Sequence, residues 1–187
     1  DVPRDLGDML GFWSHSLACG VGARVLASHL REYNIERYFV AGLLHDVGRL
    51  LMYLKEGEAS RRALEKARAE GVPLHRAEWE TFGFDHAQVG GYLVESWNLP
   101  GCFREAVAHH HAPSRASQYP REAAVVHIAD IIANALGLGS SGESRVPTLS
   151  TEAWDAVGLD HAAVPIVLEE LERQHASANQ MTTGLMS

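Results

Sequence analysis

The chain has 187 residues, of which 46% are hydrophobic and 21% are charged, and this suits one domain with a well-formed core. Its formal net charge of −8 argues against nucleic acid as a partner, because a general nucleic-acid binder needs a basic face that displaces counterions. No apolar run approaches the roughly 20 residues of a membrane span, and no signal-peptide pattern is present, so no membrane partner is expected either.

Helical patterns fill the first part of the chain. A first long helix carries apolar residues at i, i+4 spacing: Leu6, Leu10, Trp13, Leu17, Val21, Val25 and Leu30. Small residues along it predict close packing by a neighbouring helix: Gly11, Ala18 and Gly22. A second helix is expected over 36–45, stopping near Gly48. A third is expected over 60–71, with Gly71 in the left-handed position that ends many helices.

The second part of the chain is also predicted to be helical. Asp85 is expected to cap a helix that begins at His86, and Pro100 to open the next helix, which ends at the histidines 109–111. A strongly apolar helix is expected over 120–136. The Gly/Ser-rich segment that follows is predicted to be a mobile loop. The loop and the last two helices are expected at 138–147, 151–157 and 161–175.

No segment alternates with the period of two that a strand requires, so the sequence predicts an all-α fold. We expect a compact multi-helix bundle of roughly eight helices. One domain is expected over 1–176, followed by a polar C-terminal tail over 177–187. The opening DVPRDL has no methionine, which predicts a fragment or a processed chain.

The two cysteines, Cys19 and Cys102, lie far apart and form no CxxC motif. This usage predicts a reducing environment, and therefore a cytoplasmic protein. Histidine is unusually frequent, with 11 residues.

Several ionisable residues interrupt the apolar pattern at positions where it predicts core. They are His15, His45, Asp46, His86, His110, His111 and Asp130. Burying each of these groups alone would cost several kcal/mol, whereas one shared metal centre would satisfy them together. Imidazole and carboxylate ligands without thiolate suit Fe, Mn, Co, Ni or catalytic Zn.

The order H…HD…H…HH…D resembles the HD superfamily of metal-dependent phosphohydrolases. More closely, the chain is similar to the HDOD domain (HD-related output domain) of bacterial signalling proteins. The resemblance is carried by FWSHSLA, AGLLHDVGRLL, ETFGFDHAQVGGYLVESWNLP, AVAHHHAP and HIAD, which together span about residues 12–136. It implies an HD-domain bundle with a metal site in its core. The upstream helical half of a full HDOD unit is largely absent from this chain.

The resemblance also implies roles for single residues. The ligand set for one ion would be His15, His45, Asp46 and Asp130. Members with two ions use further ligands that match His86, His110 and His111, with Asp46 bridging the ions. Such a pair of ions activates a water between them. Asp46 would then be catalytic together with Arg49, which stands where lysine is common and would neutralise phosphate charge.

The function implied first is a regulatory output module in bacterial signal transduction, with hydrolase chemistry either retained or lost. The alternative is an active phosphohydrolase or phosphodiesterase on a nucleotide or cyclic dinucleotide, and a mixed-valent di-iron oxygenase is a third hypothesis. The implied cofactor is one or two divalent or mixed-valent ions, with iron and manganese favoured over zinc, cobalt, nickel and magnesium. The implied partners are a phosphate-containing small molecule and signalling proteins.

Each candidate ligand has a structural alternative. His15 could be a hydrogen-bonded core histidine, His86 a helix-capping residue, and Asp130 a salt-bridge partner of Arg49. His45 and Asp46 could simply end a helix. Favourable interaction with a helix dipole could explain His110 and His111 at a helix end, while His109 is expected to point away from them.

His127 lies three residues before Asp130, so it could serve as a further ligand or orient one. The remaining histidines in polar segments are predicted to lie at the surface: His29, His75, His161 and His175. The tryptophans are predicted to anchor the core: Trp13, Trp79, Trp97 and Trp154.

Overall fold

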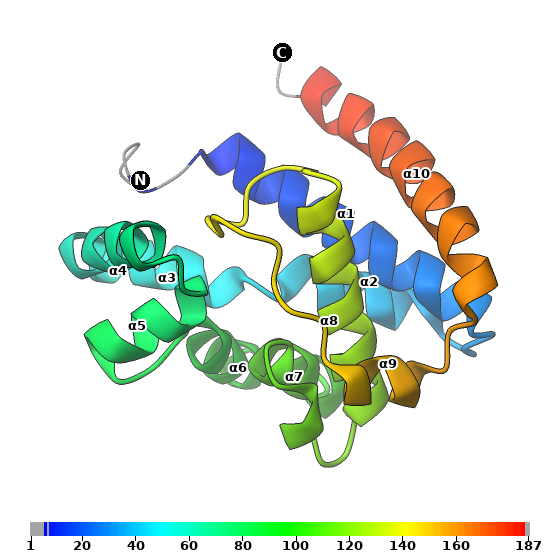
Figure 1. Cartoon of the computed structure of the whole chain (residues 1–187), viewed down its shortest axis with the longest axis horizontal. Coiled ribbons are helices and arrows are strands. Elements are labelled where there is room, and N and C mark those ends of the chain that lie inside the picture. Colours follow the sequence, from blue (N-terminus) through cyan, green and yellow to red (C-terminus); the bar gives the residue numbers. More distant parts are fainter. Residues whose placement is uncertain (1–5, 7, 186–187) are drawn as a thin grey trace.

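The computed structural model describes Leu6 and residues 8–185, and for residues 181–185 it describes the backbone alone. All regular secondary structure in this part of the chain is helical, which confirms the predicted all-α fold. Figure 1 shows the arrangement of the helices. The α-helices are α1 (Met9–His29), α2 (Ile35–Leu44), α3 (Val47–Lys55), α4 (Gly57–Glu70), α5 (Leu74–Phe82), α6 (His86–Ser96), α7 (Gly101–His109), α8 (Pro120–Ala135), α9 (Thr151–Val157) and α10 (Val164–Leu185). Two short 3-10 helices are η1 (Pro113–Arg115) and η2 (His161–Ala163).

Two helices were not expected from the sequence, α3 and α5. The predicted second helix ends at Leu44, and α3 begins at Val47 after a turn that contains His45 and Asp46. The segment of the predicted polar tail is helical as far as Leu185, so α10 runs past its expected end near residue 175. Residues 186–187 of that tail lie outside the described residues. No described helix is both long and apolar enough to cross a membrane.

Helix α1 lies at the centre of the bundle, with α2, α8 and α10 packed around it (Figure 1). It is buried on all sides in its middle, where every residue from Ala18 to Ala23 is buried. At its start, two residues of the predicted apolar stripe, Leu10 and Trp13, are 66% and 48% exposed. The largest side chains of the main core include Val21, Val25, Leu26, Tyr38, Val125 and Ile128. Leu6, which precedes α1, belongs to a second core cluster formed mainly by α3, α4 and α5.

The predicted helix ends are confirmed where the sequence carries capping residues. Asp85 caps α6 through its side chain and forms a capping box with Gln88. Gly71 ends α4 in the left-handed conformation, with φ of 63°.

Glycines allow the helices around the site to approach closely. A Cβ on Gly22 of α1 would lie 2.8 Å from Cδ1 of Leu171 in α10, as the small residues of α1 predict. A Cβ on Gly42 of α2 would lie 2.6 Å from the carbonyl oxygen of Cys19 in α1. The tightest approach joins Gly48 of α3 to the start of α6, and it positions Asp46 beside His86.

Replacing Gly48 with alanine is expected to lower the free energy of unfolding by about 3 kcal/mol. The new Cβ would lie 2.1 Å from the carbonyl oxygen of His86 and 2.4 Å from the backbone nitrogen of Gly90, and backbone atoms cannot swing aside. Urea unfolding measures the loss. The control is Gly101→Ala, whose Cβ would meet only the ring of Tyr119, at 3.3 Å. A loss below about 1 kcal/mol would contradict the expected clash.

Candidate metal centre

The structure brings all seven predicted ligands into one cluster, although they come from five separate helices or turns. His15 lies on α1, His45 and Asp46 form the turn between α2 and α3, and Asp130 lies on α8. His86 is the first residue of α6, and His110 and His111 follow the last turn of α7. All except His111 are buried, with exposed fractions of 0–4%. Six of these side chains therefore face the interior, as the interrupted apolar pattern predicts.

One part of the cluster, called here the inner half, consists of His15, His45, Asp46 and Asp130. His15 Nε2 lies 3.1 Å from Asp130 Oδ1, and His45 Nε2 lies 3.7 Å from the same oxygen. Asp46 Oδ2 is 3.5 Å from His45 Nε2. Asp130 therefore pairs with histidines, and not with Arg49 as the structural alternative would have it.

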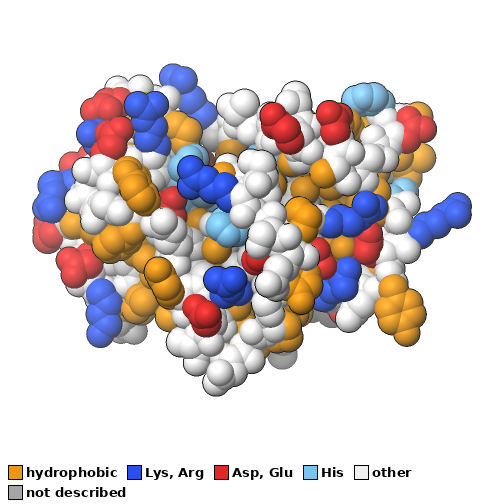
Figure 2. Space-filling model, turned by 90° about the horizontal axis from the view of Figure 1, so that it is seen from below, with side chains coloured by type: hydrophobic (Ala, Val, Ile, Leu, Met, Phe, Trp, Pro, Cys, Tyr) orange, Lys and Arg blue, Asp and Glu red, His pale blue; other side chains and the backbone are white. Residues whose placement is uncertain are grey.

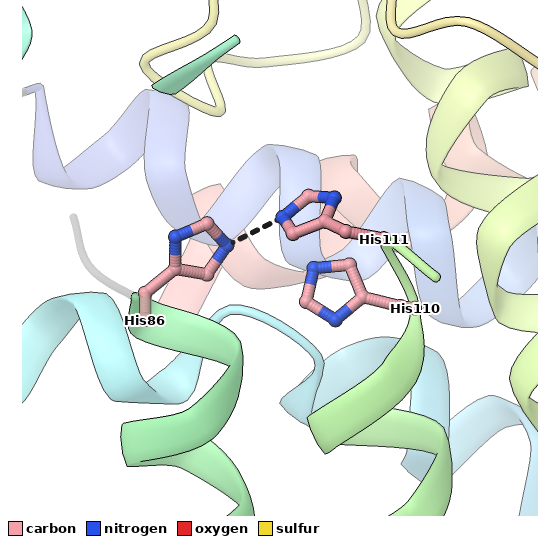
Figure 3. Close-up of side chains that lie close together, drawn as sticks. All are labelled: His86, His110 and His111. Carbon is pink, nitrogen blue, oxygen red and sulfur yellow. Dashed lines mark hydrogen bonds between the residues drawn. The ribbon is translucent and has the colours of Figure 1, made fainter. Parts of the chain in front are cut away.

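The other part, called here the pocket-side half, consists of Asp46, His86, His110 and His111. His86 Nε2 lies 2.9 Å from His111 Nε2 (Figure 3) and 3.0 Å from Asp46 Oδ1. His110 Nε2 is 3.8 Å from the same Asp46 oxygen. Asp46 thus presents Oδ2 to one half and Oδ1 to the other, which is the arrangement that a bridging carboxylate requires.

The donor atoms of this cluster fit a metal ion. His45 Nε2 and His110 Nε2 are buried without a hydrogen bond. The opposite ring nitrogens are anchored, since Nδ1 of His45 donates to the carbonyl of Gly42 at 2.7 Å and that of His110 to Val107 at 2.8 Å. Each anchor leaves the Nε2 lone pair facing the cluster. A bound ion would supply the missing partner for these atoms.

At His45, His110 and Asp130 the environment favours the protonation states that metal ligands need. Burial is the main cause that lowers the pKa of His45 and His110, so both imidazoles are neutral near pH 7. Burial alone would raise the pKa of Asp130, but the hydrogen bond from His15 and nearby histidine charge lower it to about 2. Neutral imidazoles and an ionised carboxylate can bind a cation without first losing a proton.

Glu78 of α5 is a site residue that the sequence did not reveal. Its Oε2 accepts a hydrogen bond from the backbone N–H of His86 at 3.0 Å and lies 2.5 Å from His86 Nδ1. Burial and the charge of Arg49 act to lower the pKa of His86, but Glu78 and Asp46 outweigh them and raise it to about 10. No sequence signal marks Glu78, because it lies in a charged stretch whose helix was not expected.

Arg49 is buried beside the cluster, with 1% of its surface exposed. Its Nη1 lies 2.9 Å from Asp46 Oδ2, and its Nη2 lies 3.1 Å from His86 Nε2. Its Nε is 3.9 Å from Glu78 Oε1. The guanidinium therefore stands between two buried carboxylates, and its charge offsets theirs.

Asp130 is held in place by Asn134, which in turn is bonded by the segment that the sequence predicts to be a mobile loop. Asn134 Nδ2 donates to Asp130 Oδ1 at 2.7 Å, and the hydroxyl of Ser141 donates to Asn134 Oδ1 at 2.7 Å. Ser140 N–H donates to the carbonyl of Gly11 in α1 at 2.9 Å. Ser140 and Ser141 of this segment thus pack behind the inner half.

His127 orients a ligand and does not serve as one. Its Nδ1 donates to the carbonyl of His110 at 2.7 Å, and its Nε2 accepts from the N–H of Ser150 at 3.0 Å. Both ring nitrogens are therefore used, which excludes the prediction of His127 as a further ligand and supports its orienting role.

A cavity of about 500 Å³ opens beside the pocket-side half, a volume typical of small-molecule sites. Its walls come from α5, α6 and the end of α7, and they include His75, Arg76, Trp79, His109, His111 and Arg115. Figure 2 shows histidine side chains next to basic side chains on the face formed by these helices. His111 belongs to both the cavity wall and the cluster, so the cavity gives access to the pocket-side half.

Some predictions outside the cluster are wrong. His75 is only partly exposed, and its ring stacks on His111 with ring centroids 4.1 Å apart. His175 is buried, and its Nε2 lies 3.2 Å from the carbonyl oxygen of Ser14. About half of the side-chain surface is exposed in three tryptophans predicted to anchor the core: Trp13, Trp79 and Trp97.

Comparisons with solved structures show the same fold at low sequence identity. An HDOD domain protein with unknown function from Geobacter sulfurreducens is 23% identical with a TM-score of 0.72, over 87% of this chain and 62% of that one. A candidate phosphohydrolase from Shewanella amazonensis SB2B is 23% identical with a TM-score of 0.75, over 97% and 65%. A candidate signal transduction protein from Marinobacter aquaeolei VT8 is 22% identical with a TM-score of 0.75, over 100% and 40%.

This chain therefore spans less than two thirds of the length of each of these proteins. A search of the curated proteins found no match. The family model of the HDOD domain matches residues 1–113, which is more than half of the chain. The buried histidine and aspartate cluster, the all-helical fold and this match lead to one conclusion: the chain belongs to the HDOD domain family.

Proposed function

We propose that this chain is a metal-binding HDOD domain that acts as a regulatory output module in bacterial signal transduction. The observation that carries the proposal is the pair of buried imidazole nitrogens without a hydrogen bond, His45 Nε2 and His110 Nε2, which face the buried carboxylate of Asp46. Natural proteins rarely leave such atoms without a partner. The family membership supports the signalling role, and one neighbour in fold is described as a candidate signal transduction protein.

The proposed cofactor is one or two ions of iron or manganese. Nitrogen and oxygen ligands without thiolate suit these metals, and also zinc, cobalt, nickel or magnesium to differing degrees. Burial, with the charges of Asp130 and Asp46, raises the pKa of the Cys19 thiol well above its ordinary value. Among the described residues, the groups of ligand atoms that lie close enough together to share an ion consist of imidazole nitrogens and carboxylate oxygens. The proposed location is the bacterial cytoplasm, and the proposed partners are signalling proteins.

A second candidate function is metal-dependent hydrolysis of a phosphoester, and the cavity beside His111 favours it. Bound ions would supply a nucleophilic water and neutralise phosphate charge. Asp46 and Arg49 would be the catalytic residues: Asp46 faces both halves, and the Arg49 guanidinium beside it adds positive charge. A phosphate-containing small molecule would enter through the cavity, past Trp79 and Arg115.

Elemental analysis of the purified chain tests the proposal, with one or two ions per chain as the expected result. A metal content near zero would overturn it. The loaded protein is then screened against generic phosphodiesters and common nucleotides. Absence of turnover supports the output module, whereas turnover that stops when the ions are chelated supports the hydrolase.

A further inference from the structure

We propose that Glu78 is the positioning residue of the pocket-side half: it holds His86 with Nε2 toward Asp46, and thereby determines whether this half binds an ion. The inference depends on the proposed metal-binding function. It concerns a residue that lies outside the H…HD…H…HH…D ligand pattern and that joins the site only through the fold.

Two other buried histidine ligands are anchored by the backbone. His45 and His110 each donate from Nδ1 to the carbonyl oxygen of the residue three positions earlier, Gly42 and Val107. Gly42 lies in the last turn of α2, and Val107 lies in the last turn of α7. The backbone itself therefore turns Nε2 of both rings toward the cluster.

His86 cannot be anchored in this way, because it is the first residue of α6 and has no helical turn before it. The residue three positions earlier is Gly83, which ends α5 in the left-handed conformation with φ of 77°. Glu78 supplies the missing acceptor from the neighbouring helix. Its Oε2 meets both the backbone N–H and Nδ1 of His86, so a single oxygen fixes the start of α6 and the ring.

The contact between Glu78 and His86 is buried, and it involves a carboxylate. Glu78 is 2% exposed and His86 is fully buried, so water cannot replace this contact. A carboxylate on the far nitrogen makes a histidine a stronger metal ligand than a carbonyl does, and it fixes the ring orientation. His86 is thus the ligand of this half that most depends on a side chain elsewhere in the sequence.

Glu78 lies beside the pocket-side half of the cluster. The contacts of Glu78 are with His86 and, at 3.9 Å, with Arg49, whereas Asp130 of the inner half is held by the Asn134 and Ser141 hydrogen bonds. His111 lines the cavity, while His15 and Asp130 are buried. Removing the Glu78 charge is therefore expected to weaken the pocket-side half and to leave the inner half intact.

The test titrates Mn²⁺ into the metal-free full chain by calorimetry, for the wild type, Glu78→Gln and the control Glu80→Gln. Glu80 lies two residues further along α5, is exposed, and pairs with Lys66 and Arg76. In Glu78→Gln, Mn²⁺ affinity at one site is expected to fall by about 10–100-fold. The other site and the Glu80→Gln control are expected to match the wild type.

Unchanged Mn²⁺ binding in a folded Glu78→Gln variant would overturn the inference and leave the metal-binding function standing. If the wild type binds only one ion, a weaker affinity in Glu78→Gln supports the inference and an equal affinity overturns it. A wild type that binds no Mn²⁺ or other divalent ion would overturn the proposed function, and the inference with it.

A double-mutant cycle separates positioning from a general effect on folding. In a His86→Ala background, the ring that Glu78 positions is gone, so adding Glu78→Gln is expected to cost no further Mn²⁺ affinity. Equal losses in both backgrounds would show that Glu78 acts on the fold and not through His86. If Glu78→Gln does not fold, Glu78→Asp takes its place in the same cycle. This substitution keeps the charge but shortens the side chain that reaches His86.

Discussion

Asp46→Asn is expected to remove metal from both halves of the centre, with an affinity loss of more than about 100-fold. Asp46 Oδ2 faces His45 and Oδ1 faces His86, so the substitution removes the one negative charge that both halves share. Residues that only orient a ligand typically cost 10–100-fold in metal affinity when changed, and a shared ligand should cost more. Elemental analysis after purification and Mn²⁺ titration measure the loss.

The matched control is Asp155→Asn, which changes an exposed carboxylate on α9 far along the chain. It is expected to retain the metal content of the wild type. Circular dichroism checks that both variants keep their helical content. If Asp46→Asn retained its ions, the assignment of the centre would be wrong. If the chain is a phosphohydrolase, turnover is expected to disappear with the metal.

Arg49→Met is expected to lower the free energy of unfolding of the metal-free chain by about 3–5 kcal/mol, the cost typical of breaking a buried ion pair. Arg49 is 1% exposed and lies 2.9 Å from Asp46 Oδ2 and 3.9 Å from Glu78 Oε1. Methionine fills part of the same volume but leaves both carboxylates without their cation. Urea unfolding in the presence of a chelator measures the effect.

Adding Mn²⁺ is expected to restore part of this stability, because a bound ion replaces the missing positive charge. Arg62→Met is the control, since Arg62 is exposed on α4 and its replacement should change stability by less than about 0.5 kcal/mol. A similar small change for Arg49→Met would show that its contacts with Asp46 and Glu78 contribute little. That result would leave phosphate neutralisation as the role for Arg49.

The sequence was most informative where the physical cause is local. Asp85 and Gln88 form the expected capping box because both partners lie within one turn, and Gly71 ends α4 because it needs no neighbour to adopt positive φ. The seven candidate ligands stood out because each interrupts an apolar helix pattern. They converge in the structure because a buried polar group needs a partner, and these residues serve as partners for one another.

The sequence was least informative where burial depends on a distant segment. His75 and His175 lie in polar stretches, yet one stacks on His111 and the other packs against α1. The Gly/Ser-rich segment 138–147 lacks any helical pattern, but Ser141 is buried behind Asp130. Nothing within a few residues of these positions predicts such contacts.

By itself, the sequence determined the helical class of this protein, several helix ends and the residues able to form a metal centre. These properties follow from periodicity, capping and residue chemistry, which act over a few residues. Only the tertiary structure decided that Glu78 supports His86, that Arg49 lies between two carboxylates, and that His127 is fully hydrogen-bonded. Each of those outcomes depends on the packing of separate helices, and no local pattern encodes which helices meet.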